Sequence, residues 1–254
     1  MEERNYKELK QKAFSLGAKL FGVASITKLK KDFYLPPLLL KDIDLAVSLA
    51  VPLLDGVLEE IENHPTQLYF HLYRQVNFFL DRIAFSLSTF IQDKGYLAIP
   101  IPASQVINWE KQIGHLSHKK VALYAGLGWL GRNNLIVTPE YGARVRLVTI
   151  LTNMPLAKDN PIERDCRDCK ACVSICPAGA IRMNVKDFDH ITCFEKLKEF
   201  KKFGFANQYI CGVCVKACKG EKTLTSWTKN KSANTNYISP FFNCHFVSGT
   251  HSHR

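Results

Sequence analysis

The chain has 254 residues, of which 46% are hydrophobic and 22% charged, and its formal net charge is +11. No apolar run reaches the roughly 18 residues that a membrane helix needs. The first ten residues contain no apolar stretch typical of a signal peptide. We therefore expect a globular cytoplasmic protein, with one medium domain or two smaller ones and no contact with a membrane.

Helix and strand patterns alternate over the first part of the sequence. They predict a helix over 5–17, strands over 18–25 and 43–53, and a long helix over 65–94 that ends at Gly95. The apolar stretch Tyr96–Ala103 contains Pro100 and Pro102, which favours a strand at the edge of a sheet. Ser117 is placed to cap a short helix.

A glycine-rich loop, Gly126-Leu-Gly-Trp-Leu-Gly-Arg132, follows this short helix. Its glycines permit positive φ and a close approach of the backbone to a ligand. The spacing G-x-G-x-x-G occurs here, but a dinucleotide fingerprint follows a strand and opens a helix, whereas this loop does the reverse. We reject a dinucleotide site. In the alternative interpretation the glycines only end the helix and Trp129 packs between domains. Strands over 135–138 and 143–151 follow, and their turn chemistry predicts a hairpin.

Eight of the nine cysteines fall in two compact runs and one position between them. The first run is C-x2-C-x2-C-x3-C-P, the spacing with which bacterial ferredoxins hold iron–sulfur clusters, and its fourth cysteine binds the other cluster. The second run is C-x2-C-x3-C, one ligand short of a full set. We predict two [4Fe–4S] clusters with crossed ligation, one held by Cys166, Cys169, Cys172 and Cys218, the other by Cys176, Cys193, Cys211 and Cys214.

Structural zinc is the alternative interpretation of these cysteines. Zinc sites usually show two separated C-x2-C pairs, and a compact run of four cysteines closed by proline fits them poorly. Disulfides are not expected, because nothing in the sequence indicates an oxidising compartment. The ninth cysteine, Cys244, lies outside both sets, in a polar stretch over 222–254 that we predict to be a disordered tail.

Positive charge is concentrated in the last quarter of the sequence. Residues 191–254 carry nine Lys and one Arg against three Glu. Such a surface attracts nucleic acid or an acidic redox partner. The solvated face of a helix is the alternative interpretation of Lys196, Lys198, Lys201 and Lys202. A binding surface and a solvated face both stay open.

The segment Ser117–Arg132, the two strands after it and the cysteine runs together resemble the epoxyqueuosine reductases of tRNA modification. The resemblance extends from the first helix to Cys218. It implies an α+β fold, with a nitroreductase-like corrinoid-binding α/β domain over 1–157 and a two-cluster ferredoxin-like domain over 158–221. It also implies an iron–sulfur oxidoreductase whose clusters reduce a cobalamin. The corrinoid pocket would be shaped by Gly126, Gly128, Trp129, Ile136 and Leu147.

The sequence departs from that family at one chemically important place. The family strand corresponding to Ile99–Ser104 carries an aspartate thought to protonate the substrate, and this chain has Pro102 and no acid there. A proline cannot protonate a leaving oxygen, so the catalytic residue is left unassigned. Tyr124, Glu110 and His115 are candidate replacements. The helical-repeat extension with which many members hold tRNA is also missing from the sequence.

We therefore expect a divergent member that keeps the redox equipment and acts on another organic substrate. An external donor of the ferredoxin or flavodoxin type would supply its electrons. Two alternatives stay open: an electron-transfer protein without its own substrate, and a tRNA-modifying reductase with a different proton donor.

Overall fold

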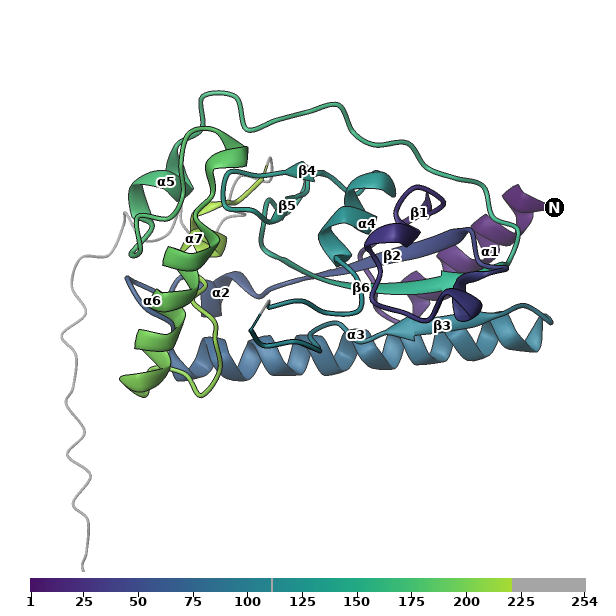
Figure 1. Cartoon of the computed structure of the whole chain (residues 1–254), viewed down its shortest axis with the longest axis horizontal. Helices are drawn as coiled ribbons and strands as arrows, with labels where there is room; N and C mark the ends of the chain where they lie inside the picture. The colour runs from purple at the N-terminus through teal and green to yellow at the C-terminus, as the bar shows by residue number, and fades with distance from the viewer. Residues whose placement is uncertain (111, 221–254) are drawn as a thin grey trace, which may run out of the picture. The chain divides into compact units, whose positions relative to one another are not determined.

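A four-stranded antiparallel sheet forms the centre of the N-terminal part of the molecule (Figure 1). The computed structural model describes residues 1–110 and 112–220. The strands follow the order β1-β2-β6-β3, and they are β1 (Leu20–Ser25), β2 (Leu45–Pro52), β6 (Val145–Thr152) and β3 (Ala98–Ile101). Because β3 lies at an edge, the predicted edge position of the proline-containing strand is confirmed.

Helices cover both faces of this sheet. Helices α1 (Glu2–Ser15) and α3 (Gln67–Asp93) pack on one face, and α4 (His118–Tyr124) packs on the other. Successive side chains of a strand point to opposite faces. In β2, accordingly, Val47 and Leu49 join the core under α3, while Ala46 and Ala50 join the core under α4. Burial on both faces explains why this strand is almost continuously apolar.

Local sequence signals set the ends of the helices. The Thr66 hydroxyl accepts a hydrogen bond from the Tyr69 amide at the start of α3, and Ser117 caps α4 as predicted. Gly95, with a φ of +86°, follows α3 in the left-handed conformation that glycine tolerates. The shorter elements of this part are the 3₁₀ turns η1 (Lys30–Asp32) and η2 (Pro37–Leu40) and the helix α2 (Asp55–Leu58).

The predicted hairpin over 135–151 is wrong in its pairing. Strand β5 (Ile136–Val137) pairs with β4 (Trp129–Leu130), whereas β6 lies between β2 and β3 in the main sheet. Only a bridge between Thr138 and Gly142 closes the turn. The cause is Gly128, where a Cβ would meet the carbonyl oxygen of Val137 at 2.1 Å. Without a side chain at this position the loop can fold back onto β5.

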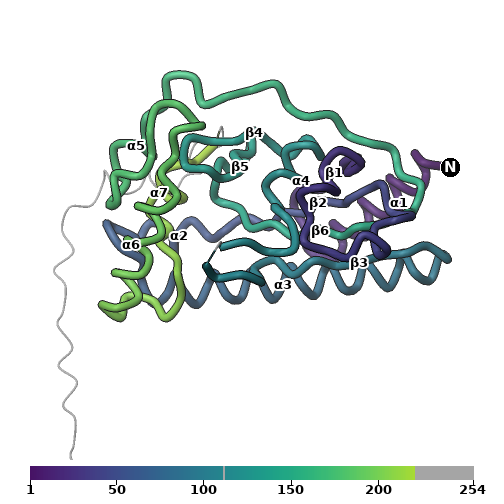
Figure 2. The backbone as a smooth tube through the Cα atoms, viewed as in Figure 1, coloured from purple at the N-terminus to yellow at the C-terminus, as the bar shows by residue number. Residues whose placement is uncertain are grey.

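A long connection without helix or strand leads from β6 into the cysteine-rich part (Figure 2). Its Asp159 makes two hydrogen bonds with Val23 of the edge strand β1: its amide donates to the Val23 carbonyl, and its side-chain carboxylate accepts from the Val23 amide. The Tyr6 hydroxyl also donates to Asp159. Burial, helped by this carboxylate, raises the pKa of Tyr6 to about 12.

The cysteine-rich part consists of short helices that pack against the N-terminal part. They are α5 (Ala171–Ile175), η3 (Val185–Asp187), α6 (His190–Lys202) and α7 (Val213–Ala217). Ile210 and Val213 belong to the same hydrophobic core as Leu58 and Tyr69. The boundary after residue 157 therefore stays a prediction, while the mixed helix-and-sheet class is confirmed.

Among the described residues, no helix is both long and apolar enough to cross a membrane. The predicted tail over 222–254 and Cys244 lie outside the residues that the structure describes.

Candidate redox site

Electrostatic interactions among the thiols divide the eight cysteines into two groups, and their assignment to two clusters stays a prediction. Thiol groups of Cys166 and Cys169 act electrostatically on Cys172, and all three act on Cys218, which comes from the far end of the described chain. We call these four the outer set. Cys176, from the first run, acts on Cys193, Cys211 and Cys214, and Cys172 also acts on Cys214. We call Cys176 and these three the cavity set.

The outer set is held by the turn between β5 and β6. The Ala143 amide donates to the Cys218 carbonyl at 3.2 Å. Gly142 lies against the same carbonyl, with a φ of +58°, and a Cβ there would meet the oxygen at 2.2 Å. Glycine is required here on both counts, because it tolerates positive φ and leaves space for the cysteine backbone.

Burial affects thiols of both sets, and Cys172 of the outer set is itself buried. Burial raises the pKa of Cys211 to about 12 and the pKa of Cys214 well above its ordinary value. Burial also raises the pKa of Cys218, to about 11. Cys169 of the outer set is exposed. Thiols with raised pKa values stay protonated unless a metal replaces the proton, so both sets suit metal-coupled thiolate formation.

Within the described residues, no three His, Cys, Asp or Glu side chains are grouped closely enough to hold a single metal ion. A [4Fe–4S] cluster does not require such a group, because each thiolate binds a different iron.

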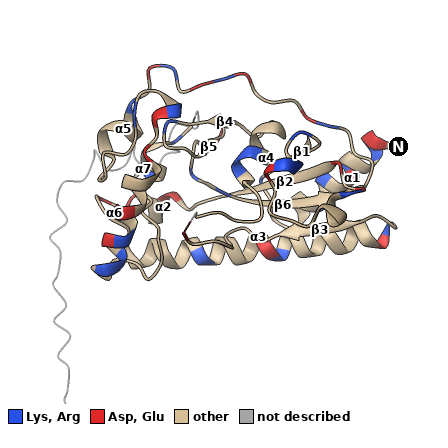
Figure 3. Ribbon diagram, in the orientation of Figure 1, with Lys and Arg blue, Asp and Glu red and all other residues tan. Residues whose placement is uncertain are grey.

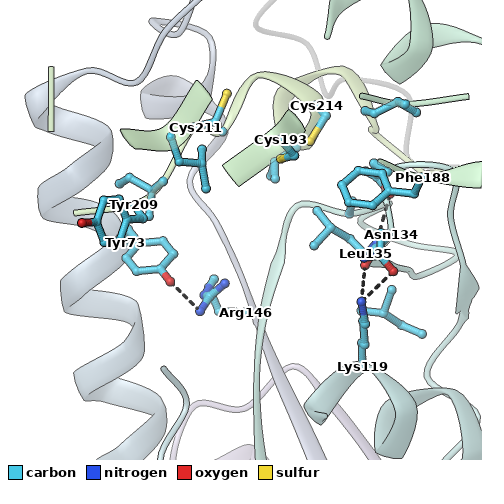
Figure 4. Close-up of a pocket in the computed structure, with 18 of the residues that line it drawn as sticks. Tyr73, Lys119, Asn134, Leu135, Arg146, Phe188, Cys193, Tyr209, Cys211 and Cys214 are labelled. Carbon is cyan, nitrogen blue, oxygen red and sulfur yellow. Dashed lines mark hydrogen bonds between the residues drawn. The ribbon is translucent and has the colours of Figure 1, made fainter. Parts of the chain in front are cut away.

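A cavity of about 450 Å³ separates the cavity set from the N-terminal sheet. Cys193, Cys211 and Cys214 lie at one end of it, and Lys119 and Arg146 lie at the other (Figure 4). Of the described residues that line it, none is an Asp or Glu, and its formal charges are positive. A ligand held here would sit beside the cavity set and meet a cationic wall.

Among the cationic side chains that line the cavity, Lys119 has a pKa that its surroundings clearly lower. It projects from the first turn of α4, and its Nζ donates to the backbone oxygen and to Oδ1 of Asn134, at 3.0 and 2.6 Å. Burial, with a smaller contribution from neighbouring Lys120, lowers the pKa of Lys119 to about 8. At neutral pH this amine holds a proton that it can release more readily than an ordinary lysine.

Arg146 and Tyr73 form a second polar pair at the cavity. Arg146 Nη2 donates to the Tyr73 hydroxyl at 3.1 Å, and its Nε donates to Asn77 Oδ1 at 2.9 Å. Its guanidinium also lies 4.3 Å from the centre of the Tyr73 ring. The Tyr73 hydroxyl is 3.0 Å from Ser104 Oγ. These contacts hold β6, α3 and the loop after β3 in one polar network.

His118 lies beside Pro102 and lines the cavity. Its Nε2 lies 2.9 Å from the Pro102 carbonyl oxygen, so that nitrogen donates, and its Nδ1 accepts from the Thr149 hydroxyl at 2.8 Å. Burial lowers the pKa of His118 to about 4, and Arg146 contributes in the same direction. We therefore assign a neutral imidazole that organises the wall of the cavity.

The structure brings only part of the predicted corrinoid pocket to this cavity. Ile136 and Leu147 line it, but Gly126, Gly128 and Trp129 do not. A Cβ at Gly126 would meet the Asn160 carbonyl oxygen at 2.5 Å. Gly126 and Gly128 each lie against another segment of the protein backbone. These close approaches explain why both positions are glycine without invoking a ligand.

The three suggested proton donors also lie away from this cavity. Tyr124 and Glu110 are not among its lining residues, and His115 lines a separate hollow of about 130 Å³. Sequence reasoning missed Tyr73, Lys119 and Arg146. Their positions inside an ordinary helix and strand pattern give no signal of function, because residues far apart in sequence meet only in the fold.

Two buried nitrogen donors near the glycine-rich loop have no hydrogen-bond partner in the described structure. They are Nδ2 of Asn133, which lines the cavity, and Nε1 of Trp129. A buried donor without a partner costs about 1–3 kcal/mol. An acceptor on a ligand in the cavity would remove this cost for Asn133.

Relatives of known name match parts of the chain, while no family model matches it. An epoxyqueuosine reductase of Bacillus anthracis is 37% identical over 119 residues, which cover 44% of this chain and 31% of that protein. A solved epoxyqueuosine reductase from Streptococcus thermophilus has a TM-score of 0.59 and 19% identity, covering 86% of this chain and 66% of that one. The resemblance to epoxyqueuosine reductases is confirmed.

Reductive dehalogenases are a second group of relatives. The tetrachloroethene reductive dehalogenase of Sulfurospirillum multivorans is 31% identical over 173 residues, which cover 61% of this chain and 32% of that protein. A reductive dehalogenase structure described as suggesting a mechanism for B12-dependent dehalogenation has a TM-score of 0.70 at 19% identity, over 86% of this chain and 32% of that one. The chain spans about a third of the length of the curated epoxyqueuosine reductase and dehalogenase that it matches. It shares their fold and is related to oxidoreductases.

Proposed function

We propose that the chain is an iron–sulfur oxidoreductase that carries two [4Fe–4S] clusters and a corrinoid and reduces an organic substrate. The observation that carries this proposal is the cavity, which has four cysteines of one set at one end and ionisable side chains of the N-terminal part at the other. An electron carrier without its own substrate has no use for such a space. The B12-dependent dehalogenase of the same fold supports the choice of corrinoid.

The residues present fit these groups. Each cysteine set offers four thiols, the number that a [4Fe–4S] cluster takes. Ile136 and Leu147 offer apolar surface to a flat ring, and Asn133 Nδ2 offers a hydrogen-bond donor that has no protein partner. When bound, the clusters would supply single electrons and the corrinoid a strongly reducing cobalt centre.

The side chains of the cavity would handle the proton. A two-electron reduction that replaces a leaving group by hydrogen takes up one proton, and the proline on the strand after α3 cannot give it. Lys119 Nζ is the group that we assign, because its pKa of about 8 keeps it protonated at neutral pH yet able to donate. Arg146 holds the Tyr73 hydroxyl in place and offers positive charge to an anionic substrate or leaving group.

Electrons would enter at the outer set and leave at the cavity set. Cys169 of the outer set is exposed, so an external ferredoxin or flavodoxin can approach that cluster. All four cysteines of the cavity set line the cavity, so that cluster would be next to the reaction. The exposure of Cys169 supports this proposed direction of transfer.

A spectral titration tests this proposal. The full chain, purified without oxygen and with its iron counted, should change the visible spectrum of added cobalamin as it binds. Leu147→Trp would fill the cavity and should weaken that response without loss of iron. Leu54→Trp, at an exposed position outside the cavity, is the matched control. Full iron with no cobalamin response in the natural chain would contradict the corrinoid and leave the electron-carrier alternative.

A tRNA substrate is the second candidate, favoured by the named activity of the epoxyqueuosine reductase relatives. The basic residues on α6 alternate with acidic ones (Figure 3), and Lys196 and Lys198 pair with Glu199 and Glu195. Lys201 instead lies 4.7 Å from the centre of the Tyr209 ring. Replacing Lys201 and Lys202 by Gln should lower tRNA affinity and its salt dependence if this helix holds tRNA. Unchanged binding would leave α6 as a solvated face.

A further inference from the structure

Arg132, the last residue of the glycine-rich loop, makes contacts that the corrinoid proposal does not use. Its Nε donates to the Met183 carbonyl at 2.6 Å, its Nη1 to the Cys169 carbonyl at 2.8 Å, and its Nη2 to the Arg167 carbonyl at 2.5 Å. The guanidinium fork suits such a cluster of acceptors, because it presents five N–H donors in one plane. One side chain of the N-terminal part thereby holds the backbone inside the first cysteine run and just beyond it.

The backbone that Arg132 holds is in an unusual conformation. Arg167, between the first two cysteines of the run, has a φ of +42°, in the left-handed region that residues other than glycine seldom adopt. The Arg167 amide is fixed by Asp165 Oδ1 at 2.8 Å, and its carbonyl is fixed by Arg132. A strained residue persists where its surroundings determine its conformation. These two contacts hold the loop in the shape that directs Cys166 and Cys169 toward Cys172.

The same guanidinium places a positive charge beside the outer set. All three of these acceptors are neutral carbonyls, so the hydrogen bonds do not cancel its charge. The Arg132 charge also acts on Cys172, where it works against the effect of burial and of the two neighbouring thiols. A [4Fe–4S] cluster gains one negative charge when it takes up an electron, and nearby charge and hydrogen bonding set its reduction potential.

We propose that Arg132 is a positioning residue that raises the reduction potential of the outer cluster and fixes its binding loop. This inference rests on the cluster assignment of the proposed function. Its consequence is functional: an outer cluster with a higher potential accepts electrons more readily from an external donor. The glycine-rich loop would then serve electron transfer through Arg132, whether or not its glycines touch a cofactor.

The test is a redox titration of the full chain and of Arg132→Gln, followed by electron paramagnetic resonance, after iron and sulfide have been counted in each. Cys169→Ala and Cys193→Ala identify which titration step belongs to which cluster. We expect Arg132→Gln to lower the reduced fraction of the outer cluster about tenfold at a fixed potential, which is a shift of about 59 mV for a one-electron couple. The step of the cavity cluster should stay where it is.

Arg132→Lys separates charge from hydrogen bonding, because it keeps the charge and loses the fork. We expect its outer cluster to stay within about threefold of the natural reduced fraction, or less than 30 mV. Arg167→Gln is the matched control, because it removes an exposed positive charge from the same loop while leaving the three carbonyl contacts in place. Its effect should be smaller than that of Arg132→Gln.

Two results would overturn the proposal. One is an unchanged outer potential in an iron-replete Arg132→Gln variant. The other is a change in the outer-cluster potential of Arg132→Lys as large as the change expected for Arg132→Gln. This second comparison remains decisive even if Arg132→Gln cannot assemble the cluster. A natural chain without iron and sulfide would instead contradict the cluster assignment, so the two failures are distinguishable.

Discussion

The outer and cavity sets of cysteines have the same number of thiols but different surroundings. The outer set includes an exposed cysteine, and Gly142, Ala143 and the Arg132 side chain contact the backbone of its cysteines. The cavity set lines an internal space, and burial there raises the pKa of Cys214 well above its ordinary value. Under the proposed function, the two clusters are placed for different tasks, one for receiving electrons and the other for delivering them.

Removing one cysteine from each set should have the largest effect. Cys169→Ala and Cys214→Ala should each lose about half of the roughly eight irons expected for two clusters. An iron chelator added with a mild oxidant should remove iron from the natural chain in two phases. We expect the fast phase to disappear in Cys169→Ala, because the exposed cluster is attacked first, and the slow phase to disappear in Cys214→Ala. A fast phase that survives in Cys169→Ala would contradict the assignment of the exposed cluster.

Gly142→Ala should damage the outer set selectively. Its Cβ would meet the Cys218 carbonyl oxygen at 2.2 Å, so this cysteine must move. We expect iron content to fall toward half and the free energy of unfolding to fall by more than about 2 kcal/mol.

Gly179→Ala is the matched control for Gly142→Ala. Gly179 also has a positive φ, of +60°, but a Cβ there would meet nothing within 4 Å. It should cost about 1 kcal/mol from backbone strain and lose no iron. Equal iron loss in both variants would show that strain, and not contact with Cys218, explains the result.

Lys119→Met, at the cavity, should change the pH dependence of the free energy of unfolding. The pKa of Lys119 is about 8 in the fold against 10.5 for an ordinary lysine, so between these values the unfolded chain binds more protons. The natural chain must therefore lose stability as the pH falls from 10.5 to 8, and the Met variant lacks this loss. At pH 7 we expect Lys119→Met to be more stable, by about 1 kcal/mol, in anaerobic denaturation experiments. Parallel pH curves for the two proteins would contradict the burial of this amine.

His118→Gln should change the pH dependence of the free energy of unfolding only in acid. The pKa of His118 is about 4 in the fold against 6.5 ordinarily, so the unfolded chain takes up the proton first. The natural chain should lose stability relative to the Gln variant as the pH falls from 6.5 to 4, by about 1.4 kcal/mol for each pH unit at most. A constant difference across this range would mean that His118 is already protonated at neutral pH.

The sequence predicted the helices and the edge strand well because these depend on local patterns. The long helix over 67–93 follows from its apolar spacing, and the edge position of β3 follows from Pro100 and Pro102. The crossed grouping of cysteines follows from ferredoxin spacing and stays a prediction.

What the sequence missed depends on contacts between distant residues. The pairing of β5 with β4 requires the backbone of Val137 to lie against Gly128, which turn chemistry at residues 139–142 does not reveal. Lys119 and Arg146 reach one cavity from a helix and a strand that their own sequence patterns describe as ordinary. Charge clustering across elements gives no periodic signal, so it becomes visible only in three dimensions.

The most direct test of the central claim is a count of iron and acid-labile sulfide in the full chain purified without oxygen. The account predicts about eight irons and eight sulfides for each chain, because two [4Fe–4S] clusters contain that number. It also predicts that Cys176→Ala removes iron from the cavity cluster, although this residue lies in the first cysteine run. Zinc without sulfide, or loss of the outer cluster in Cys176→Ala, would contradict it.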